Sequence, residues 1–155
     1  GKVDQAEWDK SFGTFLNKGG LSCCELTDKG GKIEASLKWM VTKSTPYIPS
    51  VLVVEGKVYA INDGGVLVAL DADSGEQIHR VRLGNASGQY YASPVTAGGR
   101  MVLANLDGKV SLVRTADLKV LGTLDMEEQI AATPCIVDGR LVIRTQQKIY
   151  CFGRS

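Results

Sequence analysis

The sequence has little histidine, no paired cysteine motif and no long apolar run. His79 is the only histidine, and no two of the four cysteines form a C-x-x-C pair, so a zinc site is not expected. The longest apolar stretches, such as 51–54 and 66–70, are too short to cross a bilayer as a helix, so no transmembrane segment is predicted. No export signal can be read from the sequence either.

The chain also lacks an excess of charge of either sign. Its 18 lysines and arginines nearly balance 17 aspartates and glutamates, and the formal net charge is +1. This balance gives no reason to expect a nucleic-acid partner. The composition is 44% hydrophobic and 23% charged, which is typical of a folded protein, and 155 residues are enough for an ordinary core.

One segment is present three times and organises the chain. It begins at residue 47 as YIPSVLVVEGKVYAINDGG, returns at residue 90 as YYASPVTAGGRMVLANLDG, and returns again at residue 130 as IAATPCIVDGRLVIRTQQ. In each copy a hydroxyl residue is followed six positions later by glycine and then by a cation. Spacings of 43 and 40 residues indicate a repeat architecture. The shared positions are Ser50, Gly56 and Lys57; Ser93, Gly99 and Arg100; and Thr133, Gly139 and Arg140.

Short apolar strands, separated by glycine and aspartate turns, are predicted throughout the chain after Gly20. Two strands precede the first repeat, each of the first two repeats has four, and the third has three. Four antiparallel strands in about 40 residues are typical of a β-propeller blade. The predicted strands cover 21–26 and 35–41; 51–54, 57–62, 66–71 and 77–83; 94–96, 100–105, 110–114 and 119–124; and 134–137, 140–145 and 148–152.

We therefore predict an all-β fold, a partial β-propeller of about three four-stranded antiparallel blades with a short N-terminal α-helix. A closed propeller needs four or more blades, and the third repeat lacks its outer strand. Because open strand edges invite pairing, the chain is expected to be a fragment of a longer polypeptide or to self-associate. The predicted parts are a helix over 1–20 and a propeller over 21–155, divided into the end of one blade (21–45), two blades (46–88 and 89–128) and an incomplete blade (129–155).

The segment 66-VLVALDADSGEQIHRVRLG-84 resembles the blade repeat of the PQQ-like propellers of the quinoprotein dehydrogenase superfamily. There a strand ends in an ALDA-x-(T/S)-G turn that leads into an outer strand. The three repeated segments are similar to the C-terminal blades of bacterial PQQ-binding-like repeat proteins, and these resemble the propeller of the outer-membrane assembly lipoprotein. The resemblance covers about 21–153 and implies a periplasmic or cell-surface location. Many members of the superfamily bind no quinone, so it implies fold more than function.

The first eight residues, GKVDQAEW, resemble the second half of an EF-hand loop that enters its exit helix. On that match Asp4 holds the water-mediated position and Glu7 supplies the bidentate carboxylate, so both would bind Ca²⁺ only if the first half of the loop lay upstream. The alternative is an ordinary amphipathic helix packed against the propeller. Trp8, Phe12, Phe15 and Leu16 fall on one face of such a helix.

Two kinds of cysteine are present. Cys23 and Cys24 are adjacent, as in the vicinal disulfide that lies near the cofactor of some quinoprotein dehydrogenases. On a strand, however, neighbouring side chains point to opposite faces, so an ordinary strand is favoured over a redox site. Cys135 and Cys151 lie within apolar strand patterns and are expected to be buried.

Aromatic residues and repeated cations are the remaining candidates for a site. Tyr47, Tyr90 and Tyr91 precede the innermost strands, where exposed aromatic rings would suit partner binding, and packing between blades is the alternative. Trp39 is expected to pack at a blade boundary. The three repeated cations either line a rim of the ring or flank turns in solvent. His79 has no acid placed to orient it as a base.

We conclude from the sequence that the chain is a non-catalytic binding or scaffold module, without catalytic or cofactor-binding residues of its own. Its expected partner is another protein or the remainder of its own propeller. A fragment of a PQQ-dependent quinoprotein dehydrogenase is the first alternative, and a calcium-responsive module is the second. Neither PQQ nor Ca²⁺ is expected as a cofactor on the residues present.

Overall fold

The computed structural model describes residues 19–153, and the only regular elements among them are β-strands. This confirms the predicted all-β class, whereas nearly all of the predicted helix over 1–20 lies outside the described residues. The strands are β1 (Leu21–Asp28), β2 (Ile33–Val41), β3 (Leu52–Val54), β4 (Lys57–Asn62), β5 (Val66–Asp71), β6 (Gln77–Arg82), β7 (Val95–Ala97), β8 (Arg100–Ala104), β9 (Lys109–Arg114), β10 (Val120–Asp125), β11 (Cys135–Val137), β12 (Arg140–Arg144) and β13 (Ile149–Phe152).

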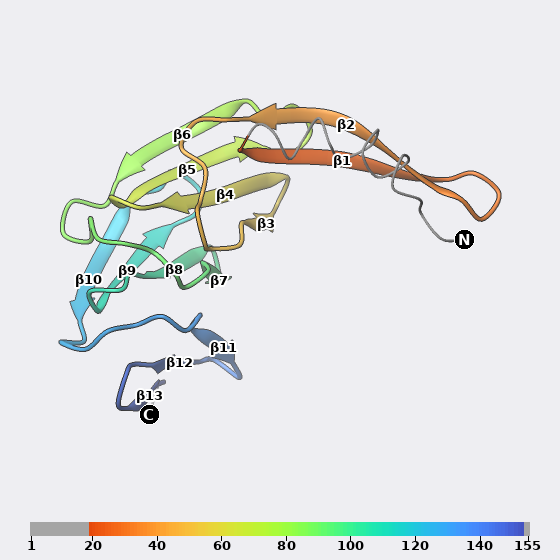
Figure 1. Ribbon diagram of the computed structural model, residues 1–155. Coiled ribbons are helices and arrows are strands. Elements are labelled where there is room, and N and C mark those ends of the chain that lie inside the picture. Colours follow the sequence, from red (N-terminus) through yellow and green to blue (C-terminus); the bar gives the residue numbers. More distant parts are fainter. Residues whose placement is uncertain (1–18, 154–155) are drawn as a thin grey trace.

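The strands form four antiparallel sheets that follow one another along the chain (Figure 1). We call them the hairpin sheet (β1–β2), the first blade (β3–β6), the second blade (β7–β10) and the last blade (β11–β13). Within a blade each strand pairs with the next one in sequence. Such meandering four-stranded sheets, packed face to face, are the blades of a propeller, so the predicted architecture is confirmed.

The repeated glycines belong to the tight turns between the first two strands of each blade. In the first blade Val54 pairs with Lys57, which leaves Glu55 and Gly56 as the two turn residues, with φ of 51° and 69°. Asp138 and Gly139 repeat this turn with φ of 49° and 70°. A two-residue hairpin of type I′ needs positive φ at both positions, which glycine adopts without steric penalty. The glycine-cation pattern is therefore a folding signal.

The core lies between neighbouring sheets. Val58 and Ala60 point from β4 toward the hairpin sheet, and Tyr59 and Ile61 point from the same strand toward the second blade. Because β4 and β5 have a sheet on each side, their residues are buried on both faces. A third cluster, which includes Val102 and Ile143, fills the space between the second and last blades.

Trp39 packs at a blade boundary, as predicted. Its indole Nε1 donates a hydrogen bond of 2.9 Å to the carbonyl of Ala72 in the first blade. Its ring lies against Gly75, where an added Cβ would come within 2.6 Å of the indole. The tryptophan thus joins the hairpin sheet to the turn between β5 and β6.

The adjacent cysteines lie at an irregularity in the hairpin sheet. Cys23 pairs with Trp39 and Cys24 pairs with Leu37, which leaves Lys38 unpaired as a bulge. Both thiols are free, as the strand reading of this segment predicts. Beyond the bulge, Cys24, Leu37 and Leu26 share the face that points away from the first blade.

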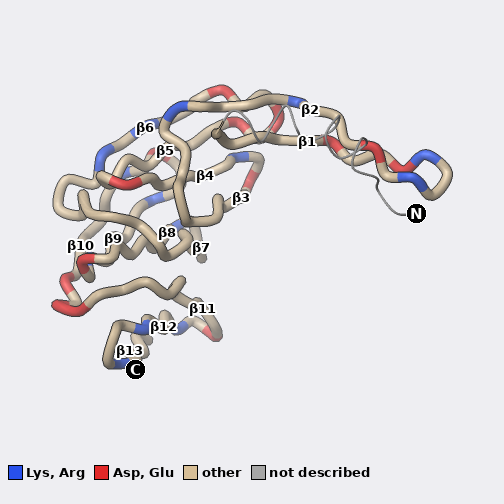
Figure 2. The backbone as a smooth tube through the Cα atoms, in the orientation of Figure 1, with Lys and Arg blue, Asp and Glu red and all other residues tan. Residues whose placement is uncertain are grey.

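Charged residues of both signs are scattered along the backbone (Figure 2). The clearest gathering of one sign is acidic and lies at the bend that follows β10, where Asp125, Glu127 and Glu128 are close in sequence. This distribution offers no continuous basic track for a nucleic-acid backbone.

Candidate functional site

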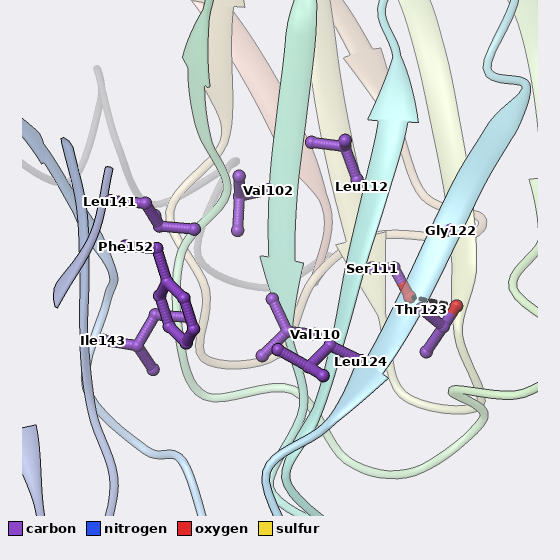
Figure 3. A pocket seen from close by; sticks show the side chains of 10 residues that line it. All are labelled: Val102, Val110, Ser111, Leu112, Gly122, Thr123, Leu124, Leu141, Ile143 and Phe152. Carbon is purple, nitrogen blue, oxygen red and sulfur yellow. Dashed lines mark hydrogen bonds between the residues drawn. The ribbon is translucent and has the colours of Figure 1, made fainter. Parts of the chain in front are cut away.

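An apolar groove lies between the second and last blades (Figure 3). It has a volume of about 370 Å³. Its only polar side chains are the hydroxyls of Ser111 and Thr123, whose oxygens are 3.5 Å apart. The groove therefore suits aliphatic or aromatic side chains rather than a charged molecule. It is lined by Val102, Val110, Ser111, Leu112, Gly122, Thr123, Leu124, Leu141, Ile143 and Phe152.

The groove exists because the last blade has three strands. In the first and second blades an outer strand pairs with the third strand, but β13 pairs with β12 alone. The face of β10 that would meet a further outer strand is consequently open, and Leu124 is exposed on it. Phe152 partly fills the space and stacks on Tyr150, with ring centroids 6.2 Å apart.

A residue difference between blades enlarges the same space. Tyr59 and Val102 occupy corresponding positions, since each pairs with the first residue of the first strand of its blade. In the first blade the tyrosine fills the gap, and its hydroxyl donates to the carbonyl of Thr115 at 3.1 Å. Valine is smaller than tyrosine and has no hydroxyl to donate a hydrogen bond. The space between the second and last blades is therefore less well filled.

The groove runs beside an open strand edge. The outer side of β13 has no partner strand among residues 19–153. An unpaired edge presents backbone donors and acceptors, and an adjacent apolar groove accepts every second side chain of an added strand. This combination of edge and groove is suited to hold an extended polypeptide segment.

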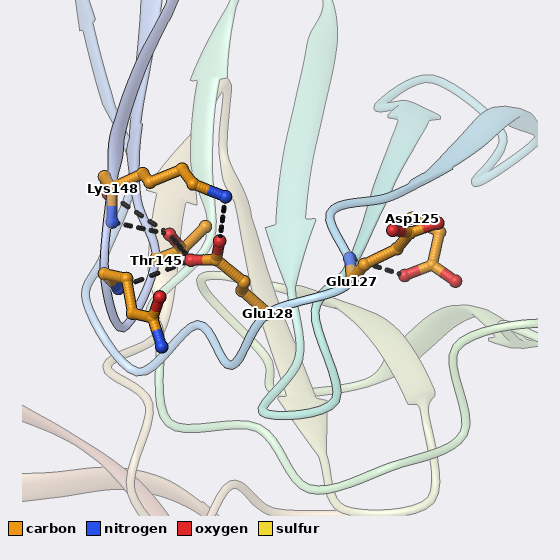
Figure 4. A network of polar contacts seen from close by, with 6 residues as sticks. Asp125, Glu127, Glu128, Thr145 and Lys148 are labelled. Carbon is orange, nitrogen blue, oxygen red and sulfur yellow. Dashed lines mark hydrogen bonds and ion pairs between the residues drawn. The ribbon is translucent and has the colours of Figure 1, made fainter.

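A polar network beside the groove fixes the connection between the second and last blades (Figure 4). The Glu128 carboxylate accepts hydrogen bonds from the Thr145 hydroxyl and the Lys148 ammonium, both at 2.5 Å, and from the backbone N–H of Gln147 at 3.3 Å. The ammonium of Lys148 and then the hydroxyl of Thr145 lower the pKa of Glu128. Since every contact joins the connection to the turn before β13, the network is structural.

A second polar feature links all three blades. The backbone N–H of Ser50 donates to the hydroxyl of Ser93 at 2.9 Å, and the N–H of Ser93 donates to the hydroxyl of Thr133 at 3.0 Å. We call this series the hydroxyl ladder. It gives the repeated Ser/Thr position a function that the sequence pattern did not reveal, because a hydroxyl in a repeat does not show which backbone group it faces.

The structure separates the three candidate tyrosines. Tyr47 and Tyr91 are exposed, but Tyr90 is buried, so its assignment to an exposed partner surface is wrong. The Tyr90 hydroxyl donates to the carbonyl of Ala86 at 2.6 Å, and its backbone N–H donates to the Asp63 carboxylate at 2.8 Å. Burial raises the pKa of its phenol. Tyr90 packs between blades, which is the alternative that the sequence left open.

Two cysteines also differ from expectation. Cys135 and Cys151 were expected to be buried, but both are exposed. They lie on the face of the last blade that points away from the second blade, and no sheet in the described part of the chain covers that face. The residues proposed for an EF-hand, Asp4 and Glu7, lie outside the described residues.

The side chains of the described residues 19–153 do not fit a quinone or a metal. Within residues 19–153 no group of three His, Cys, Asp or Glu side chains could hold a metal ion. The groove has no cationic side chain that could pair with the carboxylates of PQQ. The ring of Trp39 packs on Gly75 and so is not available to stack on a quinone. No helix in the described part of the chain has the length and apolarity to cross a membrane.

Comparison with known protein families shows the family to which the chain belongs. The profile of the family described as outer membrane protein assembly factor BamB matches residues 27–151. The chain belongs to this family of PQQ-like propeller repeats. A comparison with curated protein sequences finds no match.

Solved structures show the same fold. BamB from Moraxella catarrhalis superposes with a TM-score of 0.65 at 20% identity, covering 86% of this chain and 44% of that one. Quinohemoprotein alcohol dehydrogenase ADHIIG from Pseudomonas putida HK5 gives 0.55 at 21% identity, covering 64% and 17%. The computationally designed protein Ika4 gives 0.64 at 12% identity, covering 79% of each chain. The chain therefore spans less than half the length of the BamB structure.

Proposed function

We propose that the chain is part of a non-catalytic propeller that binds polypeptide and serves as a scaffold in the bacterial cell envelope. The observation that carries this proposal is the apolar groove beside the open edge of β13. Strand addition satisfies the backbone groups of such an edge and gives alternate side chains an apolar site. The name of the family, which refers to outer-membrane assembly, supports the envelope location and a role in protein interaction.

The natural occupant of the groove is an extended segment with apolar residues at every second position. The chain contains a close model of one in the outer strand of the second blade, because β9 receives β10 as β13 would receive the occupant. A peptide with the sequence of residues 119–126, KVLGTLDM, is therefore a suitable probe.

The proposal is tested by titrating this peptide into the chain and following amide exchange in β13. Binding should slow exchange at the outer edge of β13. Leu124→Asp places a charge in the groove and should weaken binding about tenfold or more, which corresponds to about 1.4 kcal/mol. Leu121→Asp is the matched control, because Leu121 is exposed on the same strand but does not line the groove. Equal affinities for the two variants would contradict a groove site.

A second arm distinguishes the scaffold from the dehydrogenase alternative. The chain is incubated with PQQ and Ca²⁺, freed of unbound cofactor, and examined for quinone absorbance and dye-linked alcohol oxidation. A scaffold should retain no stoichiometric quinone and show no turnover. Retained quinone that turns over would replace the scaffold proposal with the dehydrogenase reading.

A further inference from the structure

The hairpin sheet has one face that no neighbouring sheet covers among residues 19–153. Leu21, Trp39 and Val41 pack toward the first blade, and Cys23 pairs with Trp39 and so points the same way. Because side chains alternate along a strand, every second residue of β1 from Ser22 onward, with its partner on β2, points to the opposite side. We call this side the free face. Its apolar members are Cys24, Leu26, Ile33, Ala35, Leu37 and Met40.

The free face exposes apolar side chains toward the turn of the hairpin. Leu26, Ile33 and Leu37 are 68%, 62% and 45% exposed. Over the same stretch the side that faces the first blade has only polar residues, which are Glu25, Thr27, Glu34 and Ser36. The apolar residues of this stretch therefore do not serve the contact with the first blade.

The hairpin is also too long for a blade to cover. β1 and β2 have 8 and 9 residues, whereas the strands of the first blade have 3 to 6. The far ends of β1 and β2 accordingly extend beyond the first blade (Figure 1). A blade with strands of that length on the other side would leave the same residues uncovered. The occupant of this part of the free face is therefore not a blade.

The sequence immediately before β1 has complementary chemistry. Trp8, Phe12, Phe15 and Leu16 recur at the spacing of one helix face. They lie outside the described residues, and their pattern is known from the sequence. A helix over 4–16 has a length of about 20 Å. The free face has the same length along β1, at about 3.3 Å for each of about six residue steps.

The linker that enters β1 limits how this segment can reach the free face. Gly20 passes close to the end of β2, since an added Cβ would come within 2.6 Å of the Val41 carbonyl oxygen. Residues 17–20 connect Leu16 to Leu21 and span at most about 18 Å. The far end of β1 is about 23 Å from Leu21, which is beyond this reach. A helix on the free face must therefore end near Gly20 and run antiparallel to β1.

We infer that the free face of the hairpin sheet is the docking surface for the segment 4–16 of the same chain, which binds there as an amphipathic helix antiparallel to β1. In this arrangement Phe15 lies near Cys24, and Trp8 lies toward the turn between β1 and β2. Burial of the aromatic side chains against the exposed aliphatic ones stabilises the contact. The inference is independent of the proposed function, because the free face and the apolar groove lie on different sheets.

Adjacent cysteines on opposite faces provide the test. Cys24 lies on the free face, whereas Cys23 faces the first blade. The 155-residue chain is pulse-labelled with a maleimide, and each thiol is quantified by tandem mass spectrometry. Phe12→Asp should speed labelling of Cys24 at least about tenfold and leave that of Cys23 unchanged. Thr14→Asp is the matched control, because position 14 falls on the opposite side of the same helix, and it should change neither rate.

Disulfide formation with the native thiol tests the direction of the helix. Under mild oxidation Phe15→Cys should form a disulfide with Cys24. Trp8→Cys should not, because seven residues of helix place it about 10 Å further along the hairpin. A preference of Cys24 for position 8 would overturn the antiparallel arrangement.

A substitution on the hairpin gives the reciprocal measurement. Leu26→Asp should speed chymotrypsin cleavage after Phe12 at least about tenfold, whereas Thr27→Asp, on the other face of the same strand, should not. Labelling of Cys24 that Phe12→Asp leaves unchanged overturns the inference and leaves the groove proposal standing. Protection of Cys24 that grows with protein concentration shows that a second copy covers the free face, which also overturns it.

Discussion

At the scale of single residues, the same position in two blades solves the same packing problem in different ways. Gly75 and Leu118 correspond, since each N–H donates to the carbonyl four residues earlier, and their φ values are 74° and 57°. Between the hairpin sheet and the first blade, glycine leaves room for the ring of Trp39. Between the first and second blades, the side chain of Leu118 is itself buried in the core. The two blades thus share a backbone conformation at this position, but different side chains fill the space beside it.

Gly75→Ala should destabilise the fold more than Gly56→Ala. Both glycines have positive φ, which costs about 1 kcal/mol for a residue with a Cβ. At Gly75 the new Cβ must also displace Trp39, which adds about 2 kcal/mol of overpacking, whereas nothing lies within 4 Å of the position at Gly56. Urea unfolding of the two variants measures the difference. Equal losses in the free energy of unfolding would show that the packing of Trp39 does not require glycine at position 75.

Glu128→Gln should reduce stability at neutral pH and have little effect in acid. The pKa of Glu128 is lowered in the folded state by Lys148 and Thr145, so its contribution is present above the unfolded value near 4.5 and is lost as the pH falls through the folded value. Glu128 raises the pKa of Lys148 in turn, so that contribution is present below about 10.5 and is lost as the pH rises through the folded value. Urea unfolding midpoints measured from pH 2 to pH 11 would show both the loss in acid and the loss in alkali.

Glu127→Gln is the control for this pH series. It removes the same charge one residue away, from a side chain that is exposed and has no hydrogen-bond partner among the described residues. Its midpoints should track those of the unsubstituted chain throughout. A difference between Glu128→Gln and the unsubstituted chain that persists at pH 2 would mean that the carboxylate does not act through its ionised form.

At the scale of strands, β10 and β13 show what one absent strand does. Every residue of β10 is exposed, although β6, the outer strand of the first blade, is half-buried at His79 and Val81. The difference arises because β6 faces the outer part of the second blade, and β10 faces the open groove. The groove thus has the place and shape of an absent outer strand, which suits a strand better than a small molecule.

Adding an outer strand to the last blade should stabilise the chain. Phe152 corresponds to Val113, so residues 115–126, TADLKVLGTLDM, can be joined after Gly153 in the place they have in the second blade. Covering the apolar groove with an outer strand should raise the free energy of unfolding by about 2 kcal/mol, the gain from burying one or two aliphatic side chains. The matched control has aspartate at the added copy of Leu118, a residue buried in the second blade. The design is refuted if both chains unfold at the urea midpoint of the unextended protein.

At the scale of the whole molecule, stability is expected to be highest in the middle and to decrease toward both ends. The first and second blades each have a sheet on both sides, whereas among residues 19–153 the hairpin sheet and the last blade each have a neighbouring sheet on one side. Repeat proteins obtain much of their stability from the boundaries between neighbours. Loss of a neighbour therefore weakens the end units first.

Amide hydrogen exchange should reveal this gradient. Backbone amides of β4, β5, β8 and β9 should exchange most slowly, through opening of the whole chain, and those of β1, β2 and β13 should exchange through local opening. Exchange followed by mass spectrometry of peptides resolves these segments. Uniform protection across all sheets would show that the end units are as stable as the central blades.

The sequence by itself determined the architecture. The ranges 57–62 and 66–71 match β4 and β5 to the residue, because each is a short continuous apolar run bounded by turns that demand positive φ. The lack of a fourth strand in the last blade could also be predicted from the sequence, because the third repeat has three apolar strand segments and the first two repeats have four each. These features are local or periodic, and a sequence records them directly.

Only the tertiary structure decided which repeated residues face a neighbour. Tyr47 and Tyr90 are equivalent in sequence, but one is exposed and the other buried, since burial depends on whether a sheet lies alongside. The same reason exposes Cys135 and Cys151 in strands that read as core. The hydroxyl ladder and the apolar groove likewise require knowledge of which sheets are adjacent, and adjacency in space is a property of the assembled blades.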